Sequence, residues 1–160
     1  MDHSGNIEII PFEKQYAQYF YSLNIEWLKT FFYVETYDEE VLSNPEKYII
    51  NKGGHIFFAR LESAIVGTVA LMPMYDPLNF ELTKMAVSPQ FRGLKIGQFL
   101  MKHSIQFSRE NGLDKLILYS NKKLKNAIYI YRKFGFTEVP LESNNPYKRS
   151  NIKMQLPLNI

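Results

Sequence analysis

Residues 87–98, which read VSPQFRGLKIGQ, combine residue types that can hold a phosphate group. A strand pattern ends in this segment and a helical pattern begins. Gly93 and Gly97 would let a ligand approach the backbone closely, and the free N–H groups at the start of a helix bind anions. Arg92 and Lys95 add positive charge. The segment therefore predicts either a phosphate-binding turn or a strand-to-helix turn that uses glycine without any ligand.

Two familiar phosphate-binding motifs do not fit these residues. A P-loop requires Gly-Lys followed by Ser or Thr, and a dinucleotide fingerprint requires the spacing Gly-x-Gly-x-x-Gly. Neither spacing occurs in the segment. The residue types alone therefore do not identify which phosphate compound would bind.

The elements that must position this turn follow from the periodicity of the apolar residues. Apolar residues at 16, 20, 23, 27 and 31 predict an amphipathic helix. Asp38 is a plausible N-cap of a second helix, and Asn44-Pro45 is typical of a further helix start. Helical patterns also cover about 96–111 and 124–134, and strands are expected over 7–11, 55–61, 65–72, 80–87, 116–119, 136–139 and 152–156.

The strand at 80–87 is important because it leads directly into the turn. Side chains of a strand alternate between its two faces. One face would carry Glu81, Thr83, Met85 and Val87. The other would carry Leu82, Lys84 and Ala86.

The composition is that of a globular chain. Of its 160 residues, 46% are hydrophobic and 22% are charged, which argues against a disordered protein. The length and the absence of a linker predict one domain over residues 1–160. The order of elements predicts a mixed α/β (layered α+β) fold, with about seven strands in a mixed sheet flanked by about four helices.

Several classes of protein and site are excluded or disfavoured. The absence of cysteine excludes a disulfide scaffold, a zinc–cysteine site and a cysteine nucleophile. The three histidines lack metal-ligand spacing, so no metal site is expected, and a formal charge of +3 is too weak to argue for nucleic acid. The N-terminus lacks a signal-peptide pattern, and no apolar stretch approaches the roughly 20 residues of a membrane helix. We therefore expect a cytoplasmic protein without a membrane segment.

Two motifs in this order resemble the GNAT N-acetyltransferase superfamily. The family's pyrophosphate motif, Gln/Arg-x-x-Gly-x-Gly/Ala, aligns with residues 90–95, and a later family segment is present as AIYIYRKFGF at 127–136. The expected elements match the family's layout over nearly the whole chain, which implies a mostly antiparallel sheet. Lys95 departs from the pattern, because the family prefers Gly or Ala at that position.

The resemblance implies acetyl-coenzyme A as the acyl donor. The family's pantetheine arm binds main-chain groups of the strand before the turn, where that strand separates from its neighbour at a β-bulge. The implied pyrophosphate ligands are the amides of Arg92, Gly93, Leu94, Lys95, Ile96, Gly97 and Gln98. The implied partners of the arm are Met85, Ala86 and Val87, with Asn121 or Asn126 as further candidates, although either asparagine would also suit a helix cap.

The resemblance also suggests acid and base roles. Tyr131 matches a family tyrosine near the thioester sulfur, and a phenol with a pKa of about 10 could protonate the leaving thiolate. Glu81 is the candidate general base for the acceptor amine. The alternatives are a core aromatic residue at 131 and an ordinary carboxylate at 81. Since no cysteine can carry an acetyl group, direct transfer is expected.

The acceptor is expected to be a small-molecule or peptide amine, without further identification. The resemblance implies a pocket built by the first two helices and the last strands, with aromatic residues and acids at its rim, and residues 145–149 are a further candidate wall. Two other functions stay open: a non-catalytic acyl-CoA-binding regulatory module, and a nucleic-acid-binding domain that uses the lysines at 122, 123 and 125. The lysine run is also typical of a solvated face. A homodimer is a further expectation from the resemblance.

Overall fold

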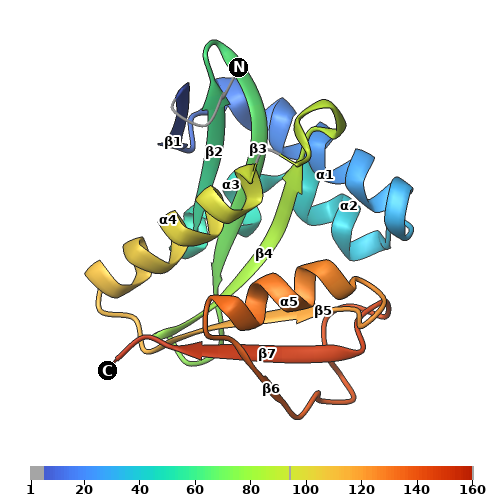
Figure 1. The fold of residues 1–160 in the computed structure, drawn as a ribbon, viewed down its shortest axis with the longest axis vertical. Coiled ribbons are helices and arrows are strands. Elements are labelled where there is room, and N and C mark those ends of the chain that lie inside the picture. Colours follow the sequence, from blue (N-terminus) through green and yellow to red (C-terminus); the bar gives the residue numbers. More distant parts are fainter. Residues whose placement is uncertain (1–5, 94, 160) are drawn as a thin grey trace.

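The computed structural model of this chain describes residues 6–93 and 95–159. Within them one seven-stranded sheet has the order β1-β2-β3-β4-β5-β7-β6 (Figure 1). Neighbouring strands are antiparallel except for β4 and β5, which are parallel. The strands are β1 Ile7–Pro11, β2 His55–Leu61, β3 Ala64–Pro73, β4 Asn79–Val87, β5 Lys115–Ser120, β6 Thr137–Val139 and β7 Ile152–Pro157.

The described residues form five α-helices where the sequence predicts about four. They are α1 Ala17–Phe31, α2 Thr36–Ser43, α3 Pro45–Tyr48, α4 Ile96–Glu110 and α5 Lys125–Lys133. Proline occupies the first turn of α3, as its sequence predicts. The mixed, mostly antiparallel layered fold is confirmed.

The start of α2 differs from the prediction. Its N-cap is Glu35, and Asp38 is the third helical residue of a capping box. The Asp38 carboxylate accepts a hydrogen bond from the backbone N–H of Glu35 at 2.9 Å. An acid at the third position of a capping box and an acid at the N-cap look alike in a sequence, so the helix start is displaced by three residues.

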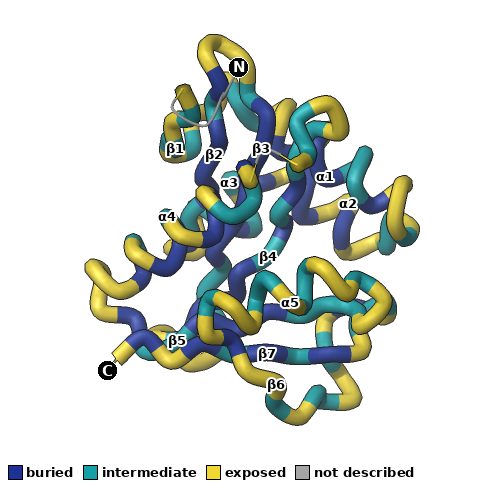
Figure 2. Tube along the Cα trace, viewed as in Figure 1, coloured by how far each residue is buried: buried dark blue, intermediate teal, exposed yellow. Residues whose placement is uncertain are grey.

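Two apolar cores lie on the two faces of the sheet, whose central strands are buried along much of their length (Figure 2). One core packs α4 against β2 to β4 through residues such as Ile96 and Leu100. The other packs α1, α2 and α3 against the opposite face, with Phe20, Leu42 and Phe58 fully buried. The sheet is therefore a rigid central layer that carries the turn at the end of β4.

A β-bulge in β4 overturns the expected alternation of its side chains. Thr83 pairs with Ala70 and Ala86 pairs with Thr68, so two residues of β4 oppose one of β3. Lys84 has φ 58° at this bulge. An extra residue shifts the period by one, so Leu82 and Met85 both contact the α4 core. Glu81 therefore does not share a face with Met85.

Strands β4 and β5 separate immediately beyond Glu81. Their parallel pairing covers only Asn79 to Glu81 against Lys115 to Ile117. Beyond it the two ribbons diverge, and α1 and α5 lie on either side of the gap (Figure 1). This separation and the bulge agree with what the resemblance implies for the strand before the turn.

Candidate active site

The separation of β4 from β5 opens a cleft of about 680 Å³. Its walls come from parts of the chain that are distant in sequence: α1, residues 82–87 of β4, the end of β5 with α5, and Tyr147, Arg149 and Ser150, together with Asp38 of α2 and Arg92 of the turn. Trp27 and Phe31 of α1 pack against each other at 5.2 Å between ring centroids and form an aromatic side of this cleft. The cleft therefore offers an apolar wall beside exposed backbone of β4.

A second cavity of about 320 Å³ lies at the start of α4. Its lining includes most of the predicted pyrophosphate ligands: Arg92, Gly93, Lys95, Ile96, Gly97 and Gln98. Both cavities share Met85, Val87, Arg92, Asn126, Ala127 and Tyr131. The two cavities are therefore adjacent, with these six residues common to both, between the start of α4 and the aromatic wall of α1.

The turn before α4 has a backbone that suits a bound anion. Gly93 has φ 94° and Lys95 has φ 62°, so both adopt the left-handed conformation. The first helical hydrogen bond runs from Phe99 N to Lys95 O at 3.1 Å, which leaves the N–H groups of 96–98 for another acceptor. The left-handed backbone explains physically why glycine suits the position of Lys95. Leu94 lies outside the described residues.

The absence of a side chain at Gly97 also leaves space for a phosphate ester beside the turn. A Cβ atom added at Gly97 would lie 3.7 Å from Met85 Sδ, so a side chain there would occupy the space between the helix start and β4. The glycine thus leaves backbone accessible where β4 and α4 meet. These residues have the form required to hold the diphosphate of coenzyme A.

Arg92 is held by α1. Its guanidinium donates to Glu26 Oε2 at 2.7 Å and lies 5.4 Å from the Phe31 ring centroid. Both side chains are about one-third exposed. The Arg92 side chain therefore joins the turn to the aromatic wall, while its main chain faces the smaller cavity.

Tyr131 lies where the two cavities meet, on α5. Burial raises the pKa of the Tyr131 phenol, and an interaction with the Ser120 side chain opposes that shift. Its ring packs edge-on against Phe136 at 6.1 Å. A phenol with a raised pKa is fully protonated at neutral pH, as a proton donor must be.

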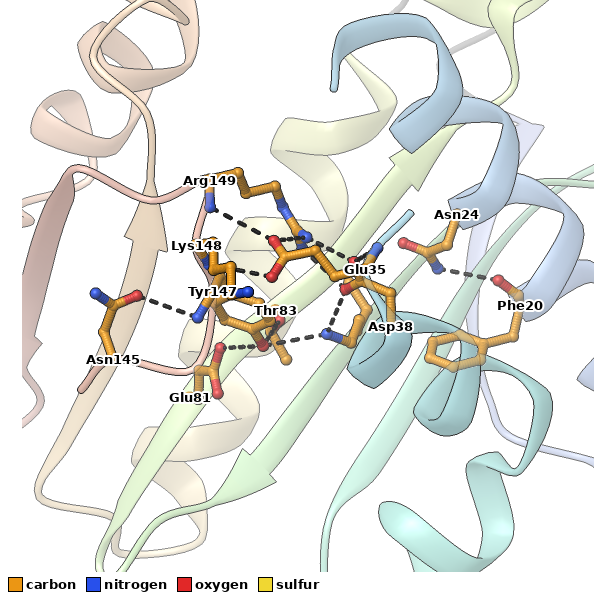
Figure 3. Close-up of polar contacts among 11 residues, drawn as sticks. Phe20, Asn24, Glu35, Asp38, Glu81, Thr83, Asn145, Tyr147, Lys148 and Arg149 are labelled. Carbon is orange, nitrogen blue, oxygen red and sulfur yellow. Dashed lines mark hydrogen bonds and ion pairs between the residues drawn. The ribbon is translucent and has the colours of Figure 1, made fainter. Parts of the chain in front are cut away.

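Glu81 does not line either cavity in the described part of the chain. Only 8% of the residue is exposed, and its carboxylate accepts a hydrogen bond from the Tyr147 hydroxyl at 2.8 Å (Figure 3). Burial raises the pKa of Glu81, while Lys84 and Tyr147 oppose the shift. Tyr147, from the loop before β7, lies between this carboxylate and the larger cleft.

Arg149, two residues after Tyr147, also lines the larger cleft. The Arg149 guanidinium donates to Asp38 Oδ2 at 2.6 Å, to Asp38 Oδ1 at 3.0 Å and to Glu35 Oε2 at 2.9 Å (Figure 3). The Asp38 side chain is fully buried. Two of the acids expected at the rim of an acceptor pocket, Glu35 and Asp38, are therefore paired with Arg149, which joins the loop before β7 to α2.

Asn121 and Asn126 both line the larger cleft, and the Asn121 side chain already makes two hydrogen bonds within the protein. The Asn121 side chain donates to Arg149 O at 2.8 Å and accepts from Lys123 N at 3.0 Å. Asn126 lines both cavities. Lys123 Nζ donates to Phe31 O at 2.9 Å and lies 4.0 Å from the Phe32 ring centroid, so it joins the start of α5 to the end of α1.

Sequence reasoning assigned no role to Lys84. Its side chain is 3% exposed, lines the cleft, and donates to the Tyr147 hydroxyl at 3.1 Å. The sequence did contain a signal for this residue, namely a lysine within an otherwise buried central strand. Because an unpaired lysine is rarely buried, a lysine in a buried strand indicates a specific partner. In the described ranges, no group of three metal-ligating side chains is present, and no helix has the length and hydropathy of a membrane span.

Comparison with known proteins identifies the family. A model of the acetyltransferase (GNAT) family matches residues 17–136, which include the turn, the separated strand and Tyr131. The chain belongs to the GNAT acetyltransferase family. An uncharacterized N-acetyltransferase of Schizosaccharomyces pombe is 32% identical to this GNAT protein over 109 residues, which are 68% of this chain and 67% of the relative. The chain spans about half the length of the rat N-acetyltransferases that it also matches.

Solved GNAT structures share the fold over nearly the whole chain. A GNAT acetyltransferase of Staphylococcus aureus Mu50 superposes with a TM-score of 0.83 at 27% identity, over 96% of this chain and 99% of the other. PaiA N-acetyltransferase of Thermoplasma acidophilum, solved in complex with coenzyme A, superposes with a TM-score of 0.72 at 18% identity, over 94% and 98%. This GNAT protein therefore carries the complete core of the fold.

Proposed function

We propose that this GNAT protein transfers the acetyl group of acetyl-CoA directly to a primary amine of a small molecule or peptide. The observation that supports the proposal is the pair of adjacent cavities, which share Tyr131 and lie between the helix start of α4 and the aromatic wall of α1. A phosphate-binding site at one end and a proton donor at the junction are what acyl transfer from a coenzyme thioester requires.

Acetyl-CoA would supply an activated acetyl thioester. The amides of 96–98 and the Gly93 turn would hold its diphosphate, and main-chain groups of Met85, Ala86 and Val87 would hold the pantetheine arm. A β4 amide aimed at the thioester carbonyl would stabilise negative charge on its oxygen. The separation of β4 from β5 leaves these main-chain groups without a strand neighbour on that side, which supports this placement.

Two side chains would move the protons. The Tyr131 hydroxyl would donate its proton to the leaving sulfur, and the pKa raised by burial keeps that proton in place until the thiolate forms. Glu81 would be the final acceptor of the proton from the amine. The acceptor would enter beside Trp27 and Phe31, which offer an apolar surface.

Calorimetric titration with acetyl-CoA, followed by a thiol-release assay with an amine panel, tests the proposal. We expect saturable binding and thiol release with at least one amine. Binding without thiol release would instead favour the non-catalytic acyl-CoA-binding module. Absence of binding by the folded protein would leave only a similarity of fold. Cytoplasmic location, a homodimer and a single domain over 1–160 stay predictions.

A further inference from the structure

Three side chains form a hydrogen-bonded chain that leads from the cleft into the protein. Lys84 Nζ lies 3.1 Å from the Tyr147 hydroxyl oxygen, and that hydroxyl donates to Glu81 Oε2 at 2.8 Å. Thr83 Oγ1 lies 3.1 Å from the same hydroxyl. Because the Tyr147 hydrogen points to the carboxylate, Thr83 and Lys84 are donors to its oxygen.

The two ends of this chain differ in access to the cleft. Lys84 and Tyr147 line the cleft, whereas Glu81 lines neither cavity within the described residues. Both lone-pair positions of the Tyr147 oxygen already accept hydrogen bonds. An acceptor amine in the cleft can therefore reach Glu81 through a group that donates to the Tyr147 oxygen, and of the two, Thr83 and Lys84, the amine of Lys84 is the stronger base.

We propose that Lys84, Tyr147 and Glu81 form a proton wire in which Lys84 is the catalytic base that touches the acceptor amine. The inference rests on the proposed acetyl transfer and assigns the step that prepares the amine for attack. It also gives Glu81 a role that its burial alone would prevent.

Each proton in this step is accounted for. One N–H bond of the Lys84 ammonium breaks as its proton passes to the Tyr147 oxygen, while the Tyr147 O–H proton passes to Glu81. Neutral Lys84 then forms a new N–H bond with the proton of the acceptor ammonium. The net change is one proton moved from the amine to the Glu81 carboxylate, which releases it to solvent after the product leaves.

The surroundings favour the relocated proton. Burial lowers the pKa of Lys84 and raises the pKa of Glu81, so both shifts favour a neutral amine beside a neutral carboxyl. The attraction between Lys84 and Glu81 is the main opposing cause for both groups; Asp38, 3.7 Å from Lys84 Nζ, also opposes the loss of charge from the lysine, and Arg149 favours it. From α2, the Tyr37 ring also faces the ammonium at 5.6 Å.

The backbone explains how a lysine of a central strand reaches the cleft. At the bulge Lys84 adopts φ 58°, a left-handed conformation that is strained for a non-glycine residue. Strain of this kind persists where surrounding structure holds it. Here the hydrogen bond to Tyr147, the Asp38 carboxylate and the Tyr147 ring, 4.6 Å from Nζ, hold the side chain.

The alternative role for Lys84 is a fixed positive charge that balances Asp38. Lys84→Arg separates the two roles, because arginine keeps the charge and cannot be deprotonated in a protein. Tyr147→Phe keeps the ring packing and breaks the wire in its middle. Glu81→Gln removes the proton sink. Lys102→Arg, at an exposed position of α4, is the matched control.

The experiment measures kcat/KM from about pH 7 to about pH 10, a range in which amines lose their proton unaided. The probe is whichever of spermidine, L-phenylalanine or tri-alanine the unmodified protein acetylates fastest. We expect Lys84→Arg, Tyr147→Phe and Glu81→Gln to lower kcat/KM by about a hundredfold at pH 7. The deficit should shrink as the pH rises, because a free amine needs no base. Acetyl-CoA affinity by calorimetry should not change.

Two results would overturn the wire while leaving the proposed function intact. One is full activity of Lys84→Arg and Tyr147→Phe; the other is a loss of activity that is the same at every pH, as a structural role would produce. If Lys84→Arg fails to bind acetyl-CoA, Tyr147→Phe decides alone. Binding of acetyl-CoA by the unmodified protein without thiol release from any of the three amines would overturn the proposed function and the wire together.

Discussion

At the scale of single residues, burial decides which titratable groups can exchange protons. Tyr131 and Glu81 both have pKa values raised by burial, but Tyr131 lies at the junction of the two cavities whereas Glu81 lies behind Tyr147. The proposed proton donor therefore has direct access to both cavities, whereas the proposed proton acceptor has only indirect access to the larger one.

Replacement of Tyr131 by phenylalanine tests the donor. The change removes one hydroxyl from a well-packed ring, so we expect kcat to fall by about 10²-fold or more, while acetyl-CoA affinity is nearly unchanged. Tyr129→Phe is the matched control, because that side chain lies on the same helix and is 67% exposed. Steady-state kinetics with calorimetry check both variants, and unchanged kcat in Tyr131→Phe would remove the residue from the acid role.

At the scale of elements, the turn before α4 and the bulge in β4 determine which groups face the two cavities. Both contain non-glycine residues in the left-handed conformation, Lys95 and Lys84. The turn directs backbone N–H groups of α4 toward the smaller cavity, and the bulge directs the side chain of Lys84 into the larger one. Local backbone geometry thus places both the proposed anion site and the proposed base.

Replacement of Gly93 by aspartate tests the turn. Gly93 has φ 94°, so aspartate adds backbone strain and a negative charge where a diphosphate is expected. We expect acetyl-CoA affinity to fall by about tenfold or more, equivalent to about 1.4 kcal/mol. Gly112→Asp is the control, since Gly112 has φ 72° beyond the far end of α4. Equal losses in calorimetric affinity for the two variants would contradict the assignment.

Two histidines between β2 and α4 make stability depend on pH. His55 packs edge-on against Phe107 and His103 against Phe57, each at 4.6 Å. Burial lowers the pKa of both below the usual 6.5. The unfolded chain therefore binds more protons just below pH 6.5, so the stabilisation present above 6.5 is lost as pH falls toward the folded pKa.

The double variant His55→Phe, His103→Phe should show a smaller decrease in melting temperature between about pH 7 and about pH 5.5 than the unmodified protein. Thermal unfolding followed by circular dichroism measures the difference. Lys102→Met, at an exposed position beside His103 on α4, is the control. The same pH dependence in all three proteins would show that these histidines do not contribute.

At the scale of the whole molecule, three polar contacts join parts of the chain across the cleft. Arg92 pairs with Glu26, Lys123 donates to the carbonyl of Phe31, and Arg149 pairs with Asp38 and Glu35. The side chains of Arg92 and Glu26 are about one-third exposed, whereas the side chain of Asp38 is fully buried. The Arg149 contact should therefore contribute most to holding α2 against the loop before β7.

Replacement of Arg149 by methionine should destabilise the protein by about 3 kcal/mol, the lower end for a broken buried ion pair, because the buried Asp38 carboxylate keeps, among the described residues, only the more distant Lys84 ammonium, at 3.7 Å, as a cationic partner. Arg60→Met is the matched control. It breaks an ion pair with Glu8 that is 64% exposed on the acid side, and we expect a cost of about 0–1 kcal/mol. Urea unfolding at neutral pH measures both. Similar losses in the two variants would argue against a structural role for the Arg149 contact.

Much of the fold and part of the site could be predicted from local patterns. Residues that are close together in sequence predict the seven strands and the turn at 87–98. They also place a glycine at position 93, where the backbone is left-handed. Lys84, Tyr147 and Arg149 could not be assigned in this way. Tyr147 and Glu81 are 66 positions apart, and their hydrogen bond exists only once β4 and the loop before β7 are packed together.

The sequence by itself determined the order of elements and the family, because periodicity and turn motifs depend on near neighbours. Only the tertiary structure decided which side chains face the cleft. One residue with φ 58° in β4 reverses the alternation beyond it, so Met85 joins the α4 core while Glu81 lies with Tyr147 on the other side. A bulge of this kind leaves the strand's composition unchanged, and pairing with β3 is what makes it visible.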